Sequence, residues 1–464
     1  MRFQVWMSDQ IVENVKAAGV VGAGGAGFPT HVKIAARVDT VIANGAECEP
    51  LLRGDQHLMA AQAHEVVQGL RLVMQASGAQ HGVIALKRKY HAAITALQSA
   101  LDRQPALNIR LHLLENYYPA GDEFLLVYEV TGRLVPETGL PLHVGCIVQN
   151  VGTLVNVARA QRSEPVTHRL LTVTGEVREP KTLRVPIGTP IGEVIQWAGG
   201  AKSDDLLQKS DNVLPSAVIP VVLGGPMMGR LARSLDEPVT KTTSGIIVLP
   251  PDNVTVHHLS RPLGSWVKRG RSTCDQCRDC TDLCPRYLLG HDLEPHKIMR
   301  TINYGITEQP LNVTAAVLCC ECRLCEAYAC PLGLSPCAYY REVKRQLAAQ
   351  GWRNDVHKRT DLTPRPFREF RHVPTERLTA RLGLTKYAGF ECPLDPGDYQ
   401  PKRVSIPLRQ HIGVAARPVV REGDVVSVGD LVGEIPEGKL GARVHASISG
   451  RVERATTEEV VIVA

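Results

Sequence analysis

The sequence predicts a multidomain protein that combines mixed α/β units with an all-β unit. At 464 residues the chain is too long for one ordinary hydrophobic core, since domains typically hold about 150 residues. Apolar runs in the N-terminal third alternate with helical patterns, whereas the C-terminal end is rich in short Val and Ile strands. A dense group of cysteines lies between them. We therefore expect several modules in series, with an α/β unit first.

Composition and charge narrow the class of protein. Hydrophobic residues make up 44% of the chain and charged residues 22%, close to globular averages, so the chain should fold. The net charge of +6 is small and spread along the chain, and we expect no nucleic-acid partner. No apolar run approaches the roughly 20 residues of a membrane-spanning helix, and the N-terminus lacks a signal-peptide layout. We expect a cytoplasmic protein without a direct membrane span.

The first two units are predicted from their strand and helix patterns. In residues 1–165 the strand-like runs VDTVIA and HGVIAL alternate with helical patterns such as HLMAAQAHEVVQGLRLVMQAS, which is the rhythm of an α/β sheet. In residues 166–255 the strands RLLTVTGEV and TLRVPIG are followed by the helical IGEVIQWAGG and then by VIPVVLGG and SGIIVLP. That order fits a small β-grasp domain.

The remaining chain is predicted as a cysteine-rich domain, a linker and a β module. Residues 256–350 hold most of the cysteines among short helical pieces, and residues 351–400 contain the Pro- and Arg-rich segment DLTPRPFREFRHVPTERL, which is typical of a linker. Residues 401–464 contain Val- and Ile-rich strands separated by turns at EGD, VGD, PEGK and SGR, so a compact all-β domain is expected.

Ten of the 13 cysteines fall between Cys274 and Cys337. In a reducing compartment such a cluster indicates metal binding more than disulfides. The first run has the spacing C-x2-C-x2-C-x3-C with Pro285 directly after it, which is the spacing of bacterial 4Fe-4S ligation. A second run ends at Cys330 and is followed by Pro331, but it has four residues before its last cysteine where three are usual. The sequence therefore predicts two 4Fe-4S clusters.

The fourth cysteine of each run is expected to bind the cluster of the other run. Cluster one would then be bound by Cys274, Cys277, Cys280 and Cys330, and cluster two by Cys319, Cys322, Cys325 and Cys284. The set of eight is more firmly predicted than this partition, and the choice between Cys319 and Cys320 stays open. Structural zinc is the alternative, but zinc sites usually use two separated C-x2-C pairs. Cys320 and Cys337 are more typical of spare or buried thiols.

A glycine-rich run, VVGAGGAGFPTHVK, lies near the N-terminus. Glycines let backbone N–H groups approach a phosphate closely, but a dinucleotide fingerprint should open a helix directly after a strand, and here Pro29 and Thr30 intervene. Taken alone, the run is equally consistent with a tight turn.

Together with VIANGAECEP, YYPAGDEFLL and CIVQNVGTLVNV, the glycine-rich run resembles the flavin-binding subunit of respiratory complex I and its relatives. The resemblance implies an FMN and NADH site. Lys33 would lie near the FMN phosphate, and Glu123 would contact NADH. The implied flavin and nucleotide residues are Gly24, Gly25, Gly27, Phe28, Lys33, Asn44, Glu47, Glu49, Glu123, Asn150 and Thr153. Cys48 and Leu51 depart from the family pattern beside Glu47 and Glu49.

The C-terminal segment from Ile406 to Val452 resembles the barrel-sandwich module of the RnfC family, where that module opens the chain instead of closing it. Lipoyl and biotinyl carriers are also similar, but PEGKLGA lacks the context of a modified lysine, so Lys439 is not expected to carry one. The resemblances together imply four domains in order: a complex-I-flavoprotein-like FMN domain, a β-grasp (SLBB-like) domain, a helical two-cluster ferredoxin domain and a barrel-sandwich domain.

This domain order is similar to that of the cobalamin reductases of propanediol-utilisation microcompartments. The resemblance implies FMN and two 4Fe-4S clusters as cofactors, NADH as electron donor, and reduction of cob(III)alamin through cob(II)alamin to cob(I)alamin for coenzyme B12 recycling in propanediol degradation. It implies a corrinoid substrate or a corrinoid-adenosylating protein as partner, and shell proteins if the chain is encapsulated.

Two other functions stay open at this point: an electron-entry subunit of an Rnf-type membrane complex, and a non-catalytic metal-binding scaffold. The N-terminal helix has two interpretations as well. Ile11, Val12, Val15 and Ala18 fall on one helical face, which indicates an ordinary packing helix. A shell-targeting helix is the alternative.

Overall fold

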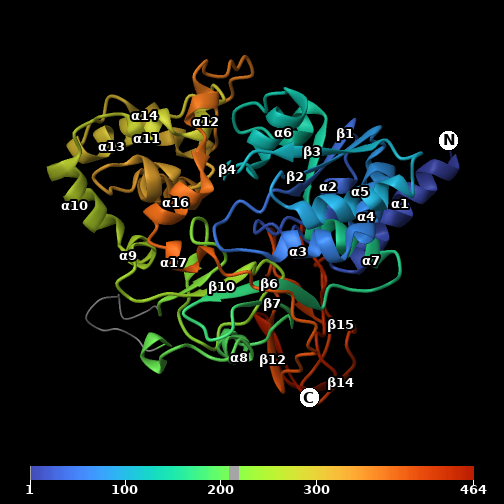
Figure 1. Cartoon of the computed structure of the whole chain (residues 1–464). Coiled ribbons are helices and arrows are strands. Elements are labelled where there is room, and N and C mark those ends of the chain that lie inside the picture. The colour runs from blue at the N-terminus through green and yellow to red at the C-terminus, as the bar shows by residue number, and fades with distance from the viewer. Residues whose placement is uncertain (1, 208–218) are drawn as a thin grey trace.

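The computed structural model describes residues 2–207 and 219–464. Its elements form four units, which Figure 1 shows as a blue α/β unit, a green sheet below it, a yellow and orange helical unit beside it, and a red β unit at the C-terminus. The mixed α/β and β class predicted from the sequence is confirmed. Within the described residues, no helix combines the length and the hydropathy that a membrane span requires.

The first unit is a parallel sheet covered by helices. Its strands pair in the order β3-β2-β1-β5, and every pairing is parallel. Strands β1 and β2 form where the sequence predicts them. The elements of the unit are α1 (Arg2–Ala17), α2 (Thr30–Ile34), β1 (Thr40–Gly45), α3 (Gly54–Ala61), α4 (Ala63–Ser77), β2 (His81–Lys87), α5 (His91–Asp102), β3 (Ile109–Leu114), β4 (Tyr117–Tyr118), α6 (Glu123–Thr131), a 3-10 turn (Pro141–Val144), β5 (Cys146–Asn150) and α7 (Val151–Ala160).

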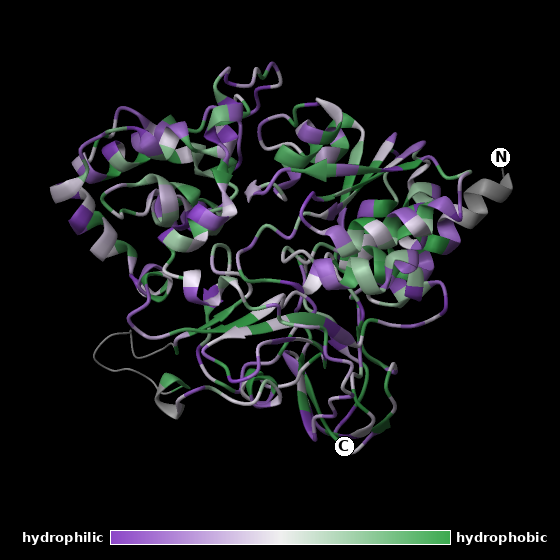
Figure 2. Cartoon of the chain, in the orientation of Figure 1, coloured by the Kyte–Doolittle hydropathy of each residue, from purple (hydrophilic) through white to green (hydrophobic). Residues whose placement is uncertain are grey.

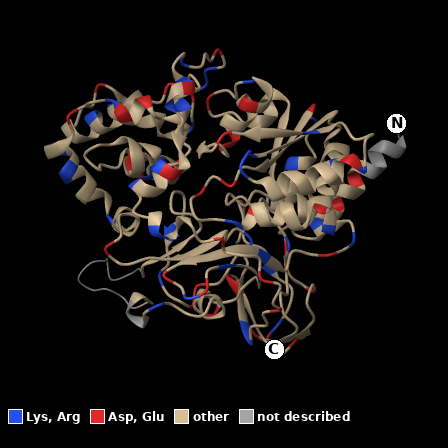
Figure 3. Cartoon of the chain, viewed as in Figure 1, with Lys and Arg blue, Asp and Glu red and all other residues tan. Residues whose placement is uncertain are grey.

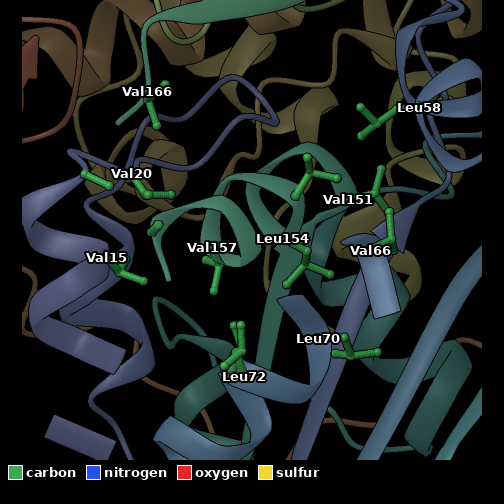
Figure 4. Packing of buried hydrophobic residues seen from close by; sticks show 14 of the residues in the cluster. Val15, Val20, Leu58, Val66, Leu70, Leu72, Val151, Leu154, Val157 and Val166 are labelled. Atoms are coloured by element: carbon green, nitrogen blue, oxygen red, sulfur yellow. The ribbon is translucent and has the colours of Figure 1, made fainter. Parts of the chain in front are cut away.

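The core of this unit lies where helices α1, α4 and α7 meet (Figure 4). Helices α4 and α7 approach so closely that a Cβ atom on Gly69 would lie 2.0 Å from the Leu154 carbonyl oxygen. The apolar face of α1 joins the same core, since Val15 is fully buried and Ile11 is 5% exposed. This end of α1 is therefore a packing helix, and its apolar face is not available for a shell protein.

The helical pattern from His57 to Ser77 is broken into two helices, α3 and α4. Gln62 leaves the helical conformation with φ −130° and ψ 38°, while its N–H donates to the Leu58 carbonyl. The apolar periodicity continues on both sides of the break, so the sequence pattern alone predicts one helix.

The second unit is the predicted β-grasp domain. Its five strands pair in the order β7-β6-β10-β8-β9, in which only β6 and β10 run parallel. Its elements are β6 (His168–Gly175), β7 (Lys181–Pro186), α8 (Ile191–Trp197), a 3-10 turn (Asp204–Leu207), β8 (Val221–Leu223), β9 (Arg230–Leu231) and β10 (Gly245–Val248).

The third unit, from 254 to 349, is built from short helices that frame the cysteine loops. Its elements are α9 (Val254–Ser260), α10 (Leu263–Thr273), α11 (Asp279–Asp282), α12 (Pro285–Leu288), α13 (Pro295–Tyr304), α14 (Pro310–Thr314), a 3-10 turn (Ala315–Leu318), a π-helical turn (Cys325–Ala329) and α15 (Pro336–Ala349).

The segment 351–400, for which the sequence predicts a linker, packs against three other units. Its Arg365 N–H donates to the Leu288 carbonyl of the third unit at 2.9 Å. The segment contains a 3-10 turn (Arg368–Arg371), β11 (Val373–Pro374), α16 (Thr375–Arg381) and α17 (Thr385–Ala388). Strand β11 pairs antiparallel with β4 of the first unit, and Leu394 forms a bridge with Thr182 of the β-grasp unit. These contacts are distant in sequence, so a local pattern does not reveal them.

The fourth unit consists of two antiparallel sheets, ordered β12-β18-β17-β14 and β13-β15-β16. Its strands are β12 (Arg403–Pro407), β13 (Arg417–Pro418), β14 (Val425–Val426), β15 (Leu431–Glu434), β16 (Val444–His445), β17 (Gly450–Ala455) and β18 (Glu459–Val463). Green hydrophobic strands occur in all three sheet-containing units (Figure 2). The charged residues are scattered over every unit (Figure 3), as their even spacing in the sequence predicts.

Candidate functional site

A cavity of about 760 Å³ lies between the first unit, the β-grasp unit and the cysteine-rich unit. Asn44 near the end of β1 and Asn150 at the end of β5 line it, so it lies at the carboxyl edge of the parallel sheet. That edge is where open α/β sheets bind their ligands. The volume falls within the range of about 300–1,000 Å³ typical of cofactor sites.

The structure brings most of the predicted flavin and nucleotide residues together in this cavity. The lining includes Gly24, Gly25, Phe28, Lys33, Asn44, Glu47, Glu49, Glu123 and Asn150. Gly27 and Thr153 lie behind it. A Cβ atom on Gly27 would lie 3.0 Å from the Thr242 side chain, and the buried Thr153 hydroxyl accepts a hydrogen bond from the Ala23 N–H at 2.9 Å. Gly27 therefore packs this loop against the β-grasp unit, and Thr153 supports the loop from outside.

The carboxylate of Glu47 binds the start of helix α3. It accepts hydrogen bonds from the N–H groups of Asp55 at 2.8 Å and of Gln56 at 3.1 Å, where the helix leaves its first N–H groups without internal partners. Burial, and then the charge of Asp55, raise the pKa of Glu47 to about 8. The carboxylate therefore holds the local backbone as well as lining the cavity.

Glu49 connects the first unit to the β-grasp unit. Its carboxylate accepts hydrogen bonds from the N–H groups of Met227 and Met228, both at 2.8 Å, and burial raises its pKa to about 7. A Cβ atom on Gly225 would lie 2.1 Å from this carboxylate, so a residue without a side chain is needed there. From the other side Arg323, which lies between two predicted cluster cysteines, donates to the Met227 carbonyl at 3.1 Å.

Lys33 and Glu123, for which the resemblance implies separate roles, form an ion pair at 3.0 Å at the cavity wall. Asn44 has both ends of its side chain bound to backbone. Its amide nitrogen donates to the Gly121 carbonyl at 2.9 Å, and its oxygen accepts from the Ala46 N–H at 3.2 Å. This residue therefore fixes the turn after β1 next to the loop that precedes α6.

The sequence analysis missed several residues of the cavity, among them Asp55, Gln149 and Arg169. The Asn150 amide donates to Asp55 at 2.6 Å. Arg169, from β6 of the β-grasp unit, donates to the Thr243 carbonyl and to the Ala23 carbonyl, both at 2.8 Å. Only Gln149 lies inside a segment that the resemblance marks. Arg169 comes from another unit, and no local pattern distinguishes it from a surface arginine.

The donor set of the cavity fits FMN. Helix α7 starts at Val151 directly after the N-cap Asn150, and its N-terminus favours an anionic group. Nothing lies within 4 Å of the Cβ position of Gly25, so the backbone there is open to the cavity. The side-chain nitrogen of Gln149 is buried without a hydrogen-bond partner among the described residues. A cofactor with a phosphate and with hydrogen-bonding ring edges would use these groups.

The crossover rule predicts a first set of cluster ligands made of Cys274, Cys277, Cys280 and Cys330. Burial, and then the charges of Cys330, Cys277, Cys274 and Cys284, raise the pKa of Cys280. The four-residue gap before Cys330 is taken up by the π-helical turn Cys325–Ala329. Such a turn accommodates one residue more than an α-helical turn, so the longer spacing is compatible with the predicted role of Cys330 in the first set.

The second set lines a separate small cavity. All four predicted ligands of cluster two line it, together with Cys320 and Cys337, and the full set of cysteines is Cys284, Cys319, Cys320, Cys322, Cys325 and Cys337. Within residues 2–207 and 219–464, no group of three or more His, Cys, Asp or Glu side chains has the geometry to hold a single metal ion.

The large cavity and the small cavity share a wall. Cys320 and Cys322 line both of them, and the buried Tyr118, which also lines the large cavity, donates from its hydroxyl to the Cys322 carbonyl at 2.8 Å. The second set of cysteines therefore lies directly beside the candidate flavin site. In the first set, Cys277 is exposed at the surface.

Four family models match the chain in the predicted order. The Nuo51 FMN-binding domain matches residues 15–159 and the SLBB domain matches residues 170–231. The 4Fe-4S dicluster domain matches residues 273–335, and the RnfC barrel sandwich hybrid domain matches residues 391–462. The FMN-binding, β-grasp, two-cluster and barrel-sandwich predictions are thereby confirmed.

Curated relatives match nearly the whole chain. Cobalamin reductase PduS of Citrobacter freundii is 45% identical over 98% of this chain and 96% of its own length. Cobalamin reductase PduS of Salmonella typhimurium is also 45% identical, over 98% of this chain and 97% of its own length. An RnfC-type relative, from the Na(+)-translocating ferredoxin:NAD(+) oxidoreductase complex of Acetobacterium woodii, is 39% identical, but over 61% of this chain and 59% of its own length. The four-unit fold, the two adjoining cavities and the full-length similarity together show that the chain belongs to the cobalamin reductase family.

Proposed function

We propose that this protein takes electrons from NADH and passes them through FMN and two 4Fe-4S clusters to corrinoid cobalt, reducing cob(III)alamin to cob(II)alamin and then to cob(I)alamin. The observation that carries the proposal is the shared wall, because Cys320 and Cys322 line both the flavin cavity and the cavity of the second cysteine set. The corrinoid acceptor rests on the full-length similarity to two cobalamin reductases.

Each cofactor supplies one part of this chemistry: a bound flavin accepts a two-electron hydride and releases electrons singly, and bound iron-sulfur clusters carry them one at a time. The chain's own residues position these groups. Gly24, Gly25 and Phe28 would hold the flavin from one side, with Asn44 and Asn150 at the strand ends. The Glu49 carboxylate holds the Met227 and Met228 backbone in place, and Met228 lines the cavity.

The nicotinamide side of the site is proposed at Glu47, Glu49 and Glu123, which line the cavity. The Lys33–Glu123 ion pair would have to open or shift when an anionic nucleotide binds beside it. We place Lys33 near the flavin phosphate on the strength of the family resemblance. Gly27 and Thr153 would act by holding the loop rather than by touching the flavin.

We propose an order in which electrons pass through the two clusters, based on how near each cysteine set lies to the flavin cavity. Cys284, Cys319, Cys322 and Cys325 would bind the cluster next to the flavin. Cys274, Cys277, Cys280 and Cys330 would bind the cluster farther from it. Because Cys277 is exposed, we propose that electrons leave the protein from this second position.

The two alternatives have less support. The RnfC-type relatives match about three fifths of the chain, whereas the cobalamin reductases match nearly all of it. A non-catalytic scaffold would have no use for two adjoining cavities with a common cysteine wall. A corrinoid-adenosylating protein as partner, shell proteins, and a place in the cytoplasm inside a microcompartment belong to the proposal and rest on the domain order.

The proposal is tested by anaerobic assays of NADH oxidation with cob(III)alamin or with ferricyanide as acceptor. We expect the unaltered protein to reduce both. Cys284→Ser removes a proposed ligand of the cluster next to the flavin, here called the inner cluster, and should lose cobalamin reduction. It should keep most of the ferricyanide activity, because ferricyanide takes electrons directly from the flavin. Cys392→Ser, at a buried thiol outside both sets, is the control. Cobalamin reduction that survives in Cys284→Ser would contradict the proposed path.

A further inference from the structure

We propose that Arg286 and Tyr340 donate hydrogen bonds to the sulfur atoms of the inner cluster and thereby raise its reduction potential. The inference rests on the proposed function, in which this cluster takes electrons from the flavin, and it adds two residues that are not ligands. Arg286 is the second residue of α12 and Tyr340 belongs to α15. Both line the small cavity that the second cysteine set forms.

Each of the two residues has a buried donor that the protein leaves without a partner. Tyr340 is fully buried and Arg286 is 7% exposed. Within the described residues, neither the Tyr340 hydroxyl nor the Arg286 Nη1 has a hydrogen-bond partner. A buried donor in this state is unfavourable in free energy. The cavity wall also includes Pro285, Leu293 and Pro295, whose side chains offer no acceptor, whereas the sulfur atoms of a bound cluster would supply one to each donor.

Other contacts of Arg286 hold its guanidinium in place. Nη2 donates to the Asp122 carboxylate at 2.9 Å, and Cζ lies 3.6 Å from the centre of the Phe124 ring. The ion pair and the aromatic face together fix the plane of the group, so that Nη1 remains as the donor for the small cavity. Asp122 lines the large cavity and caps α6. Arg286 therefore connects the cavity of the inner cluster to the wall of the flavin site.

Arg323, a second arginine of the small cavity, differs from Arg286 in this respect. Its Nε and Nη2 donate to Glu326, and its Nη1 donates to the Met227 carbonyl at 3.1 Å. All three nitrogens are thus paired within the protein. The donor without a partner at Arg286 is therefore specific to that position and not a general property of arginines that line this cavity.

The two donors would act on the charge that one electron from the flavin adds to the inner cluster. Hydrogen bonds to the sulfur atoms of a cluster are among the factors that set its potential, because they stabilise the more negative, reduced form. Arg286 and Tyr340 keep their protons throughout. Their effect is to make the inner cluster a better acceptor for the flavin electrons.

The test is an anaerobic redox titration of the loaded protein, followed by electron paramagnetic resonance. The reduction step that is missing from Cys284→Ser identifies the inner cluster. Tyr340→Phe removes only a hydroxyl and should make reduction of this cluster about tenfold less favourable, which lowers its potential by about 59 mV for one electron. An exchangeable proton coupled to the reduced cluster should also disappear from the spectrum. Arg286→Lys keeps a positive charge for Asp122 but loses Nη1, and it should lower the same potential.

Tyr339→Phe is the matched control, because Tyr339 is the neighbouring buried tyrosine of α15 and its hydroxyl already donates to the Asn303 Oδ1 at 2.8 Å. It should leave the potential of the inner cluster unchanged. If Tyr340→Phe and Arg286→Lys also leave this potential unchanged while both clusters are present, the inference is wrong although the electron path stands. If the unaltered protein holds no iron-sulfur cluster, the proposed function itself fails.

Discussion

At the scale of single residues, the second cysteine set contains two thiols more than a 4Fe-4S cluster requires. Cys319 and Cys320 are adjacent, and both line the small cavity with Cys337. Spacing favours Cys319 and Cys322 as ligands, so we expect Cys320 and Cys337 to be the spare thiols.

This assignment predicts different iron contents for two serine variants. Cys320→Ser should retain about eight irons per chain, because its thiol is not a ligand, whereas Cys322→Ser should lose about half of the iron with the inner cluster. Iron and sulfide analysis of anaerobically purified protein measures both. Loss of a cluster from Cys320→Ser, with Cys319→Ser unaffected, would reverse the assignment.

Some residues of the candidate site can be predicted from the sequence, and others cannot. The prediction of eight cluster cysteines rests on ligand spacing, which is local to each run. Phe28, Asn44 and Asn150 were found through segments that resemble a known family. Arg169 was not found, because it comes from a β-grasp strand and becomes part of the cavity only when two units pack together.

At the scale of secondary-structure elements, the close packing of α4 against α7 positions the N-terminus of α7 at the cavity. Gly69 allows this approach, since a Cβ atom there would lie 2.0 Å from the Leu154 carbonyl oxygen. Figure 4 shows Leu70 and Leu154 in the same core. The helix pattern in the sequence indicates both helices but not the distance between them.

Gly69→Ala should therefore lower the free energy of unfolding by about 1–3 kcal/mol, because the added methyl group forces the helices apart. Gly264→Ala is the matched control, since nothing lies within 4 Å of its Cβ position in helix α10. It should leave stability unchanged or raise it by up to about 1 kcal/mol. Chemical denaturation of both variants measures the difference, and equal effects would show that α4 and α7 can separate without loss.

Two elements differ from what the sequence predicts. The π-helical turn Cys325–Ala329 absorbs the extra residue in the second cysteine run, which the spacing alone leaves unexplained. The segment 351–400 pairs β11 with β4, although its Pro- and Arg-rich composition is typical of a linker. Both features depend on contacts made after folding.

At the scale of the whole molecule, Lys241 joins three of the four units. This β-grasp lysine is 3% exposed. Its Nζ donates to the carbonyl of Gly19 in the first unit and to that of Arg443 in the barrel-sandwich unit, both at 2.7 Å. The Ile412 N–H also donates to the Gly27 carbonyl at 3.0 Å. The C-terminal unit thus supports the glycine-rich loop directly.

The lowered pKa of Lys241 should make the stability of the protein depend on pH. Burial lowers its pKa from 10.5 to about 7, so between these values the unfolded chain binds more protons at this site than the folded protein does. The contribution of Lys241 to the free energy of unfolding must then rise as the pH rises from about 7 toward 10. Two neighbouring histidines stay neutral over this range. Burial, and then the charge of Lys241, lower the pKa of His411 to about 4 and that of His445 to about 3.

Lys241→Met should remove this rise and should lower stability by about 2 kcal/mol or more above pH 7, because two buried carbonyls lose their donor. Denaturation at several pH values compares it with the unaltered protein. The stability difference should widen with increasing pH. A constant difference would show that Lys241 is charged throughout, and a difference that narrows would contradict the sign of the pKa change.

In the proposed function, one chain carries electrons from NADH through a flavin and two clusters to a corrinoid. The most direct measurement is a visible spectrum of anaerobically purified protein with counted flavin, iron and sulfide, recorded after adding NADH and then cob(III)alamin. We expect about one FMN and eight irons per chain, bleaching of flavin and clusters by NADH, and recovery of their colour as the cobalt is reduced. Zinc in place of iron with no flavin, or bleaching that cob(III)alamin does not reverse, would contradict it.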